Sequence, residues 1–108
     1  MTTVSEIKAA NAAAGYYFFS RDTMKFFRSR VGATVYEGRG GIYFVTSEQF
    51  VGSDGSSGPR RFTVRQFNPD CGDINTVGPF NEMSSHKANK LAGLLAEGYT
   101  LDEANARI

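Results

Sequence analysis

Thiol and imidazole groups are almost absent from this chain of 108 residues, which has one cysteine, Cys71, and one histidine, His86. A single cysteine excludes a disulfide within the chain and a zinc site made of several cysteines of one chain. Because such low cysteine usage fits a reducing compartment, we expect a cytoplasmic protein.

Long apolar runs are also missing. No stretch reaches the roughly 18 to 20 apolar residues that a bilayer span requires, and the N-terminus lacks the charged start and apolar block of a signal peptide. We therefore expect no membrane partner. Tryptophan is absent, but nine Phe and five Tyr in a chain that is 41 % hydrophobic predict an aromatic-rich core. The length predicts one compact domain over residues 1–108.

Neither sign of charge dominates, because the formal net charge is only +1. The charges are nevertheless unevenly distributed. Residues 20–65 hold eight Lys or Arg against four Asp or Glu, whereas residues 66–108 hold three against six. A partner attracted by charge must therefore bind a local patch, because the chain as a whole has no strong field.

Two β-hairpins are predicted. Residues 62–67 alternate in character and precede the polar turn Asn-Pro-Asp-Cys-Gly, after which residues 74–77 form a second strand. Residues 33–37 and 42–46 are rich in β-branched and aromatic side chains and are joined by a glycine-rich turn at 38–41. The Gly/Ser segment 52–59 is predicted to be a flexible loop that separates the two hairpins.

Helices are predicted on both sides of the hairpins in the sequence. The first begins at Ser5 as its cap, ends at Gly15 and leaves Asn11 on its wet side; a second runs from Ser20 to Gly32 with Phe27 on its apolar face. The aromatic run 16–19 between them is expected to be buried. A third helix ends at Gly98, and a short fourth one starts with a capping box at Thr100. These elements predict an α+β fold, a four-stranded antiparallel sheet with helices packed on one face.

No recognisable catalytic set is present. Cys71 with His86 would be the candidate nucleophile and base, but nothing in the sequence places them together. Asp70 and Asp73 could hold a hard cation, although such residues in a turn more often bond their own backbone. The glycine segments 38–41 and 52–58 do not precede a helix as a phosphate-binding loop would. We therefore predict no enzyme activity, no catalytic residues, no cofactor and no metal site.

The basic residues offer the better candidate site. Arginine makes bidentate contacts with phosphates and carboxylates, and exposed tyrosines could add stacking through Tyr16, Tyr17, Tyr36 or Tyr43. The alternative is that these cations only form a solvated surface. The candidate partner-binding residues are Arg21, Lys25, Arg28, Arg30, Arg60, Arg61 and Arg65.

Three phrases of the sequence resemble a family of small uncharacterised proteins encoded by phages and mobile elements. They lie at residues 17–24, 43–47 and 62–65, and the likeness covers roughly residues 15–96. The resemblance implies an accessory protein that binds and disables a host component, such as a CRISPR effector complex, inside the host cell. The expected function is thus a non-enzymatic inhibitor of anti-CRISPR type that binds a host protein or protein complex. The alternative is a small nucleic-acid-binding domain that uses the same Arg/Lys patch.

Overall fold

The computed structural model describes residues 2–26, 28–52 and 54–108. Phe27, predicted on the apolar face of the second helix, and Ser53, in the predicted Gly/Ser loop, lie outside the described residues. The elements in chain order are α1 (Val4–Ala13), α2 (Arg21–Phe26), β1 (Arg30–Gly38), β2 (Gly41–Glu48), β3 (Arg61–Phe67), β4 (Ile74–Val77), α3 (Ser85–Glu97) and α4 (Leu101–Asn105).

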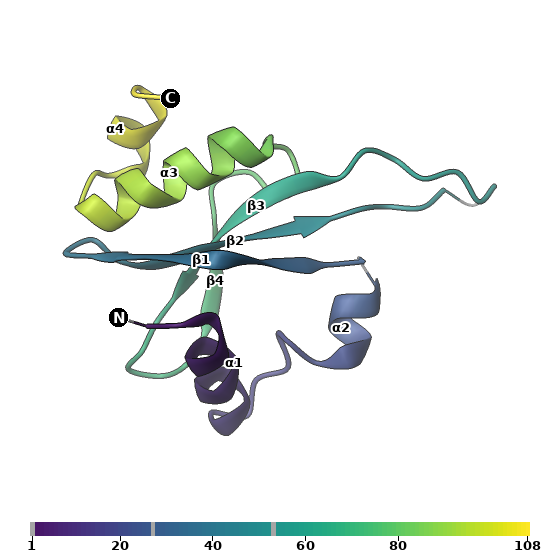
Figure 1. Ribbon diagram of the computed structural model, residues 1–108, viewed down its shortest axis with the longest axis horizontal. Coiled ribbons are helices and arrows are strands. Elements are labelled where there is room, and N and C mark those ends of the chain that lie inside the picture. Colours follow the sequence, from purple (N-terminus) through teal and green to yellow (C-terminus); the bar gives the residue numbers. More distant parts are fainter. Residues whose placement is uncertain (1, 27, 53) are drawn as a thin grey trace.

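The four strands form one antiparallel sheet in the order β1-β2-β3-β4, so the predicted fold class is confirmed. The two predicted hairpins are not separate, because β2 also pairs with β3 over its whole length, from Ile42 opposite Phe67 to Glu48 opposite Arg61. The segment between β2 and β3 continues this pairing as a narrow ribbon that projects from the body of the protein (Figure 1). A bridge between Val51 and Ser57 holds the ribbon together. We call residues 49–52 and 54–60 the arm.

Helices cover both faces of the sheet, and not one face as predicted: α3 and α4 lie on one side, α1 and α2 on the other (Figure 1). The reason is the alternation of side chains along β2. Tyr43 and Val45 join the core under α3, whereas Ile42 and Phe44 pack with Ile7 of α1 on the opposite face. Both faces of β2 are therefore buried.

Two helix boundaries differ from the predicted ones. The N-cap of α1 is Thr3 rather than Ser5, because Thr3 and Glu6 form a reciprocal capping box. Helix α2 ends at Phe26, and residues 30–32, predicted as its last turn, begin β1. The C-terminus of α3 and the N-terminus of α4 lie where they were predicted. Gly98 is the left-handed C-cap of α3, and Thr100 forms the capping box of α4.

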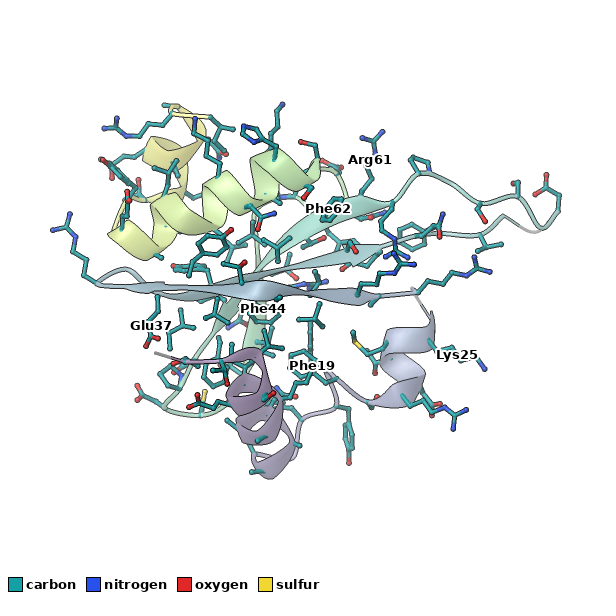
Figure 2. All side chains as sticks on the ribbon, in the orientation of Figure 1. Phe19, Lys25, Glu37, Phe44, Arg61 and Phe62 are labelled. Carbon is teal, nitrogen blue, oxygen red and sulfur yellow. The ribbon has the colours of Figure 1, made fainter. Side chains whose placement is uncertain are left out.

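The aromatic run 16–19 is buried only in its second half. Phe18 and Phe19 contact Phe44, with ring centroids 6.3 and 6.1 Å apart, and Figure 2 shows Phe19 beneath the sheet on the side to which Phe44 points. Tyr16 and Tyr17 are exposed. The connection between α1 and α2 thus anchors itself with two rings and leaves two on the surface.

Asn11 is buried, although the sequence pattern places it on the wet side of α1. Its Nδ2 donates a 2.8 Å hydrogen bond to the carbonyl of Gly72 in the β3–β4 turn, which fastens α1 to that turn. We expect Asn11→Ala to lower the free energy of unfolding by about 1 to 3 kcal/mol, because the buried carbonyl loses its partner. Urea denaturation would measure the loss. The exposed Ser5→Ala in the same helix is the control, and an equal effect of both changes would contradict the role of Asn11.

Candidate partner-binding site

A buried ion pair lies where β2 and β3 meet the arm. Arg65 Nη2 is 2.7 Å from Glu48 Oε1, and the two side chains are 11 % and 1 % exposed. Thr46 donates to the same carboxylate at 2.9 Å and accepts a 3.0 Å hydrogen bond from Arg65 Nε. Thr63 donates to the other carboxylate oxygen at 3.4 Å. Arg65, a predicted partner-binding residue, is therefore engaged inside the protein.

Two phenylalanine rings flank the Arg65 guanidinium. Its Cζ lies 5.1 Å from the ring centroid of Phe18 and 5.4 Å from that of Phe80. Phe80 in turn stands edge-on to Phe50 of the arm, with centroids 6.3 Å apart. Phe80, Phe50 and Val51 remain 41 %, 44 % and 42 % exposed, so an aromatic ridge runs from the ion pair to the arm.

A small pocket opens between α2 and the sheet. Its volume is about 150 Å³ and its wall includes the Glu48–Arg65 pair. The other lining residues are Phe18, Thr23, Met24, Ser29, Thr46 and Phe80. We call this the α2 pocket. It combines a mostly apolar wall with a polar floor whose charges neutralise each other.

Three of the predicted cations gather near the start of β1, and alternation along β1 and β2 turns Arg30 and Ser47 to the sheet face opposite the α2 pocket. Arg28 and Arg30 flank the pocket residue Ser29 in the chain, and Arg60 Nη1 donates to the carbonyl and the hydroxyl of Ser47 at 3.1 and 3.0 Å. Burial lowers the pKa of Arg60, and the charges of Arg30 and Arg28 lower it further against the opposing effect of Glu48. Arg28, Arg30 and Arg60 thus form one electrostatic cluster, which we call the basic corner.

The remaining predicted cations do not lie on one surface. Arg21 and Lys25 are exposed on α2, and Arg61 is exposed at the start of β3. Lys25 and Arg61 extend on opposite sides of the sheet (Figure 2). In the described part of the chain, Arg65 is the only one of the seven predicted cations in a salt bridge. The structure therefore divides the predicted patch into the basic corner, the buried Arg65 and three dispersed cations.

The tyrosines divide in the same way. Tyr43 is buried and Tyr36 is half-buried under α3, where its hydroxyl donates to Asn89 at 2.7 Å. Burial raises the pKa of Tyr43. Of the four candidate tyrosines, Tyr16 and Tyr17 alone are exposed enough to stack on a partner.

The candidate nucleophile and base lie apart. Cys71 belongs to the β3–β4 turn that α1 holds on one face of the sheet, and His86 is in the first turn of α3 on the other. Cys71 donates through Sγ to Asp73 at 3.1 Å, and the described residues contain no group of three or more His, Cys, Asp or Glu side chains arranged to hold a metal ion.

The glycine turn between β1 and β2 has a structural task. The N–H of Gly40 donates to the carbonyl of Ala96 at 3.0 Å, and Arg39 Nε donates to that of Glu97 at 2.6 Å. Both carbonyls belong to the last turn of α3, where backbone C=O groups have no N–H partner within the helix. This turn caps a helix C-terminus, and its glycines allow the close approach that the cap needs.

Sequence reasoning missed Glu48, Thr46 and Phe80. A usable pattern existed for the first two, because alternation along β2 places Thr46 and Glu48 on the same face as Phe44. A carboxylate on a buried strand face needs a cation, and Arg65 stands on the corresponding face of β3. No local pattern identifies Phe80, since the structure brings it to Arg65 through the loop after β4.

The site thus belongs to an α+β domain built on an antiparallel meander, with helices on both faces. Comparison with family models assigns this domain: residues 3–93 match the family of unknown function DUF7447, and the chain belongs to that family. No curated protein and no solved structure matches the chain. No helix in the described part of the chain has the length and apolar character needed to cross a bilayer.

Proposed function

We propose that this protein is a non-catalytic binding protein that docks onto another protein through the arm, the aromatic ridge and the basic corner. The observation that carries the proposal is that the projecting arm holds exposed Phe50 and Val51 together with Arg60, which forms no salt bridge in the described structure. Aromatic residues and arginine are the side chains most enriched at the energetic centres of protein interfaces. The prediction that the chain is not an enzyme stays a prediction.

The basic corner gives the first experiment. We expect Arg28→Asn, Arg30→Gln and Arg60→Gln together to abolish capture of the partner from natural host lysate, measured by quantitative mass spectrometry. Asn is chosen at Arg28 because the backbone there is left-handed, with φ at 48°, and Asn tolerates that region best after Gly.

The matched control removes the same formal charge elsewhere, with Lys87→Gln, Lys90→Gln and Arg107→Gln on exposed positions of the C-terminal half. Retention of every captured protein by the first variant, or equal losses in both, would contradict the role of the basic corner.

The sequence resemblance supplies a specific partner class, a host defence complex of the CRISPR type. If the partner is such a complex, expressing the protein in a host with active CRISPR immunity should restore plaque formation by a targeted phage. The Arg28/Arg30/Arg60 variant should not restore it. Unchanged plaque counts in hosts that carry each of the CRISPR types would remove this partner class and leave protein binding as the function.

Nucleic-acid binding is the second candidate, and the mutual repulsion within the basic corner favours it, since three clustered cations suit phosphates. Each neutralised phosphate of duplex DNA adds about 0.9 to the slope of log affinity against log salt, so the triple variant should lower that slope by about 3. Fluorescence anisotropy with labelled DNA and RNA across a salt series measures the slope. No binding at low salt would exclude this candidate.

A further inference from the structure

The arm extends beyond the strands that flank β2 and β3 in the body of the sheet (Figure 1). On one side, the described pairing of β1 with β2 goes no further toward the arm than Arg30 opposite Ser47. On the other side, the described pairing of β3 goes no further than the bridge from Phe62 to Met83. A two-stranded ribbon is only marginally stable in water, so the arm would be stabilised by a further strand at one of its edges.

The backbone groups that face these edges follow from the pairing inside the ribbon. Val51 and Ser57 lie opposite each other. Hydrogen bonds join their neighbours on either side, from Gly58 N–H to Phe50 C=O at 2.9 Å and from Gly52 N–H to Ser56 C=O at 2.7 Å. Val51 and Ser57 are therefore a non-hydrogen-bonded pair, whose own N–H and C=O groups point out of the ribbon. Those of Val51 point to the side that β1 covers in the body, and those of Ser57 point to the opposite side.

Proline blocks one of the two edges. Pro59 stands two residues after Ser57, so its backbone nitrogen faces the same edge, and proline has no N–H to donate. Proline is one of the devices that keep edge strands from pairing with other chains. The edge that holds Val51 presents both an N–H and a C=O group, and Val51 is exposed. A further strand therefore fits on the Val51 edge.

A second copy of the same edge is complementary to it. In an antiparallel pair related by a twofold axis, one residue lies opposite its own copy, and a hydrogen-bonded pair exchanges both of its N–H···O=C bonds. Val51 opposite Val51 of a second copy meets this condition, because both of its backbone groups point toward the added strand. The two arms would then form one four-stranded ribbon.

The charges at this edge are complementary as well. An arm added antiparallel on the Val51 edge lies in line with β1, and its tip points toward the residues where β1 starts. The tip holds Asp54, the only acidic residue of the arm sequence, and the start of β1 holds exposed Arg28 and Arg30. Neither arginine forms a salt bridge within the described residues. Each tip would thus bring a carboxylate to two cations of the other copy.

We propose that the arm is a self-association element, through which two copies of this chain pair antiparallel along the Val51 edge. This inference goes beyond the proposed function, which concerns the side chains of the arm and a different protein. Either proposal can fail alone, because one predicts a dimer of the pure chain and the other a complex with a partner. Two arms make a small contact, so we expect a weak dimer with a Kd of about 0.1 mM.

Sedimentation equilibrium of the full chain, from about 0.01 to 1 mM, measures the self-association. NMR spectra over the same series locate the contact, and we expect the Val51 amide to shift and to exchange more slowly with solvent as the concentration rises. The Ser57 amide should change little. A chain that stays monomeric up to about 1 mM would overturn the proposal. So would a dimer whose shifts lie outside the arm, or a Val51 amide that is protected only when another protein is added.

Val51→Pro removes the outward N–H from each copy and keeps the hydrogen bonds inside the ribbon, which use neighbouring residues. We expect it to weaken self-association about tenfold or more, because the dimer loses two hydrogen bonds. Ser57→Pro removes the corresponding N–H from the opposite edge and is the matched control, with no loss expected. Unchanged self-association of the Val51 variant, or equal losses in both variants, would contradict the proposed pairing.

A charge reversal at the tip tests the pairing without changing the hydrogen bonds beside Val51. Asp54→Lys should weaken self-association about threefold or more at low salt, since it places a cation beside Arg28 and Arg30. Glu82→Lys makes the same change of net charge at an exposed position outside the arm and should have a smaller effect. Equal effects of the two reversals, or none at Asp54, would overturn the arrangement.

Discussion

Gly40→Ala is expected to unfold most of the population or to lower stability by about 3 kcal/mol, the upper end of overpacking costs. A Cβ at Gly40 would collide with the carbonyl oxygen of Leu95 and would lie 2.8 Å from the N–H nitrogen of Gly98. Both obstacles are backbone atoms at the end of α3, so no side chain can rotate away. Circular dichroism during urea denaturation measures the effect.

Gly93→Ala in the middle of α3 is the matched control. Its new Cβ would meet only the Tyr36 ring, at an ordinary 3.6 Å, and a helical Gly-to-Ala change gains about 1 kcal/mol. Equal stability of the Gly40 and Gly93 variants would show that the turn does not contact α3 as closely as described.

Arg65→Met is expected to lower stability by about 3 to 5 kcal/mol, because it leaves the carboxylate of Glu48 buried without its cation. Met fills much of the space between Phe18 and Phe80. The loss of stability therefore reflects the missing positive charge more than a cavity. Chemical denaturation of the purified variant gives the number.

A second substitution tests that interpretation. Arg65→Met combined with Glu48→Gln removes the stranded charge, and we expect the double variant to be more stable than Arg65→Met alone. If the second change lowers stability further by its full single-variant effect, the two residues do not act as a pair. Arg61→Met at the exposed start of β3 controls for the loss of one arginine.

The strands could be predicted from the sequence because each has a local pattern. Residues 74–77 were bounded by turn residues on both sides, and the structure has β4 at those positions. The helix ends at Gly98 and Thr100 were equally accessible, since a left-handed cap and a capping box are defined by a few adjacent residues. Elements with local causes were predictable from local sequence.

Contacts between distant segments were not predictable in the same way. The burial of Asn11 depends on Gly72, which lies far along the chain, and its amide looks like a surface group on a helical wheel. The prediction that all helices share one face failed for a related reason. Placing the helices on both faces requires knowing that both faces of β2 are buried. The sequence of residues 42–45 is equally compatible with a strand that is covered on one side only.

The candidate site shows the same division. The sequence analysis named the arginines of the basic corner among its candidates but could not separate them from Arg65, because all seven cations look alike without their partners. Charge counting identifies cations, whereas burial decides which of them an external partner can reach. That decision depends on Glu48, whose pairing with Arg65 becomes evident only when β2 and β3 are placed in register.

The meander order of the sheet has a kinetic consequence. Every strand pairs with its neighbour in the sequence, and no strand has to wait for a distant segment to find its partner. Folding rates rise as contacts become more local, because less chain entropy is lost before each contact forms. The sheet can therefore assemble hairpin by hairpin as the polypeptide leaves the ribosome, and α3 closes one face after all four strands have been synthesised.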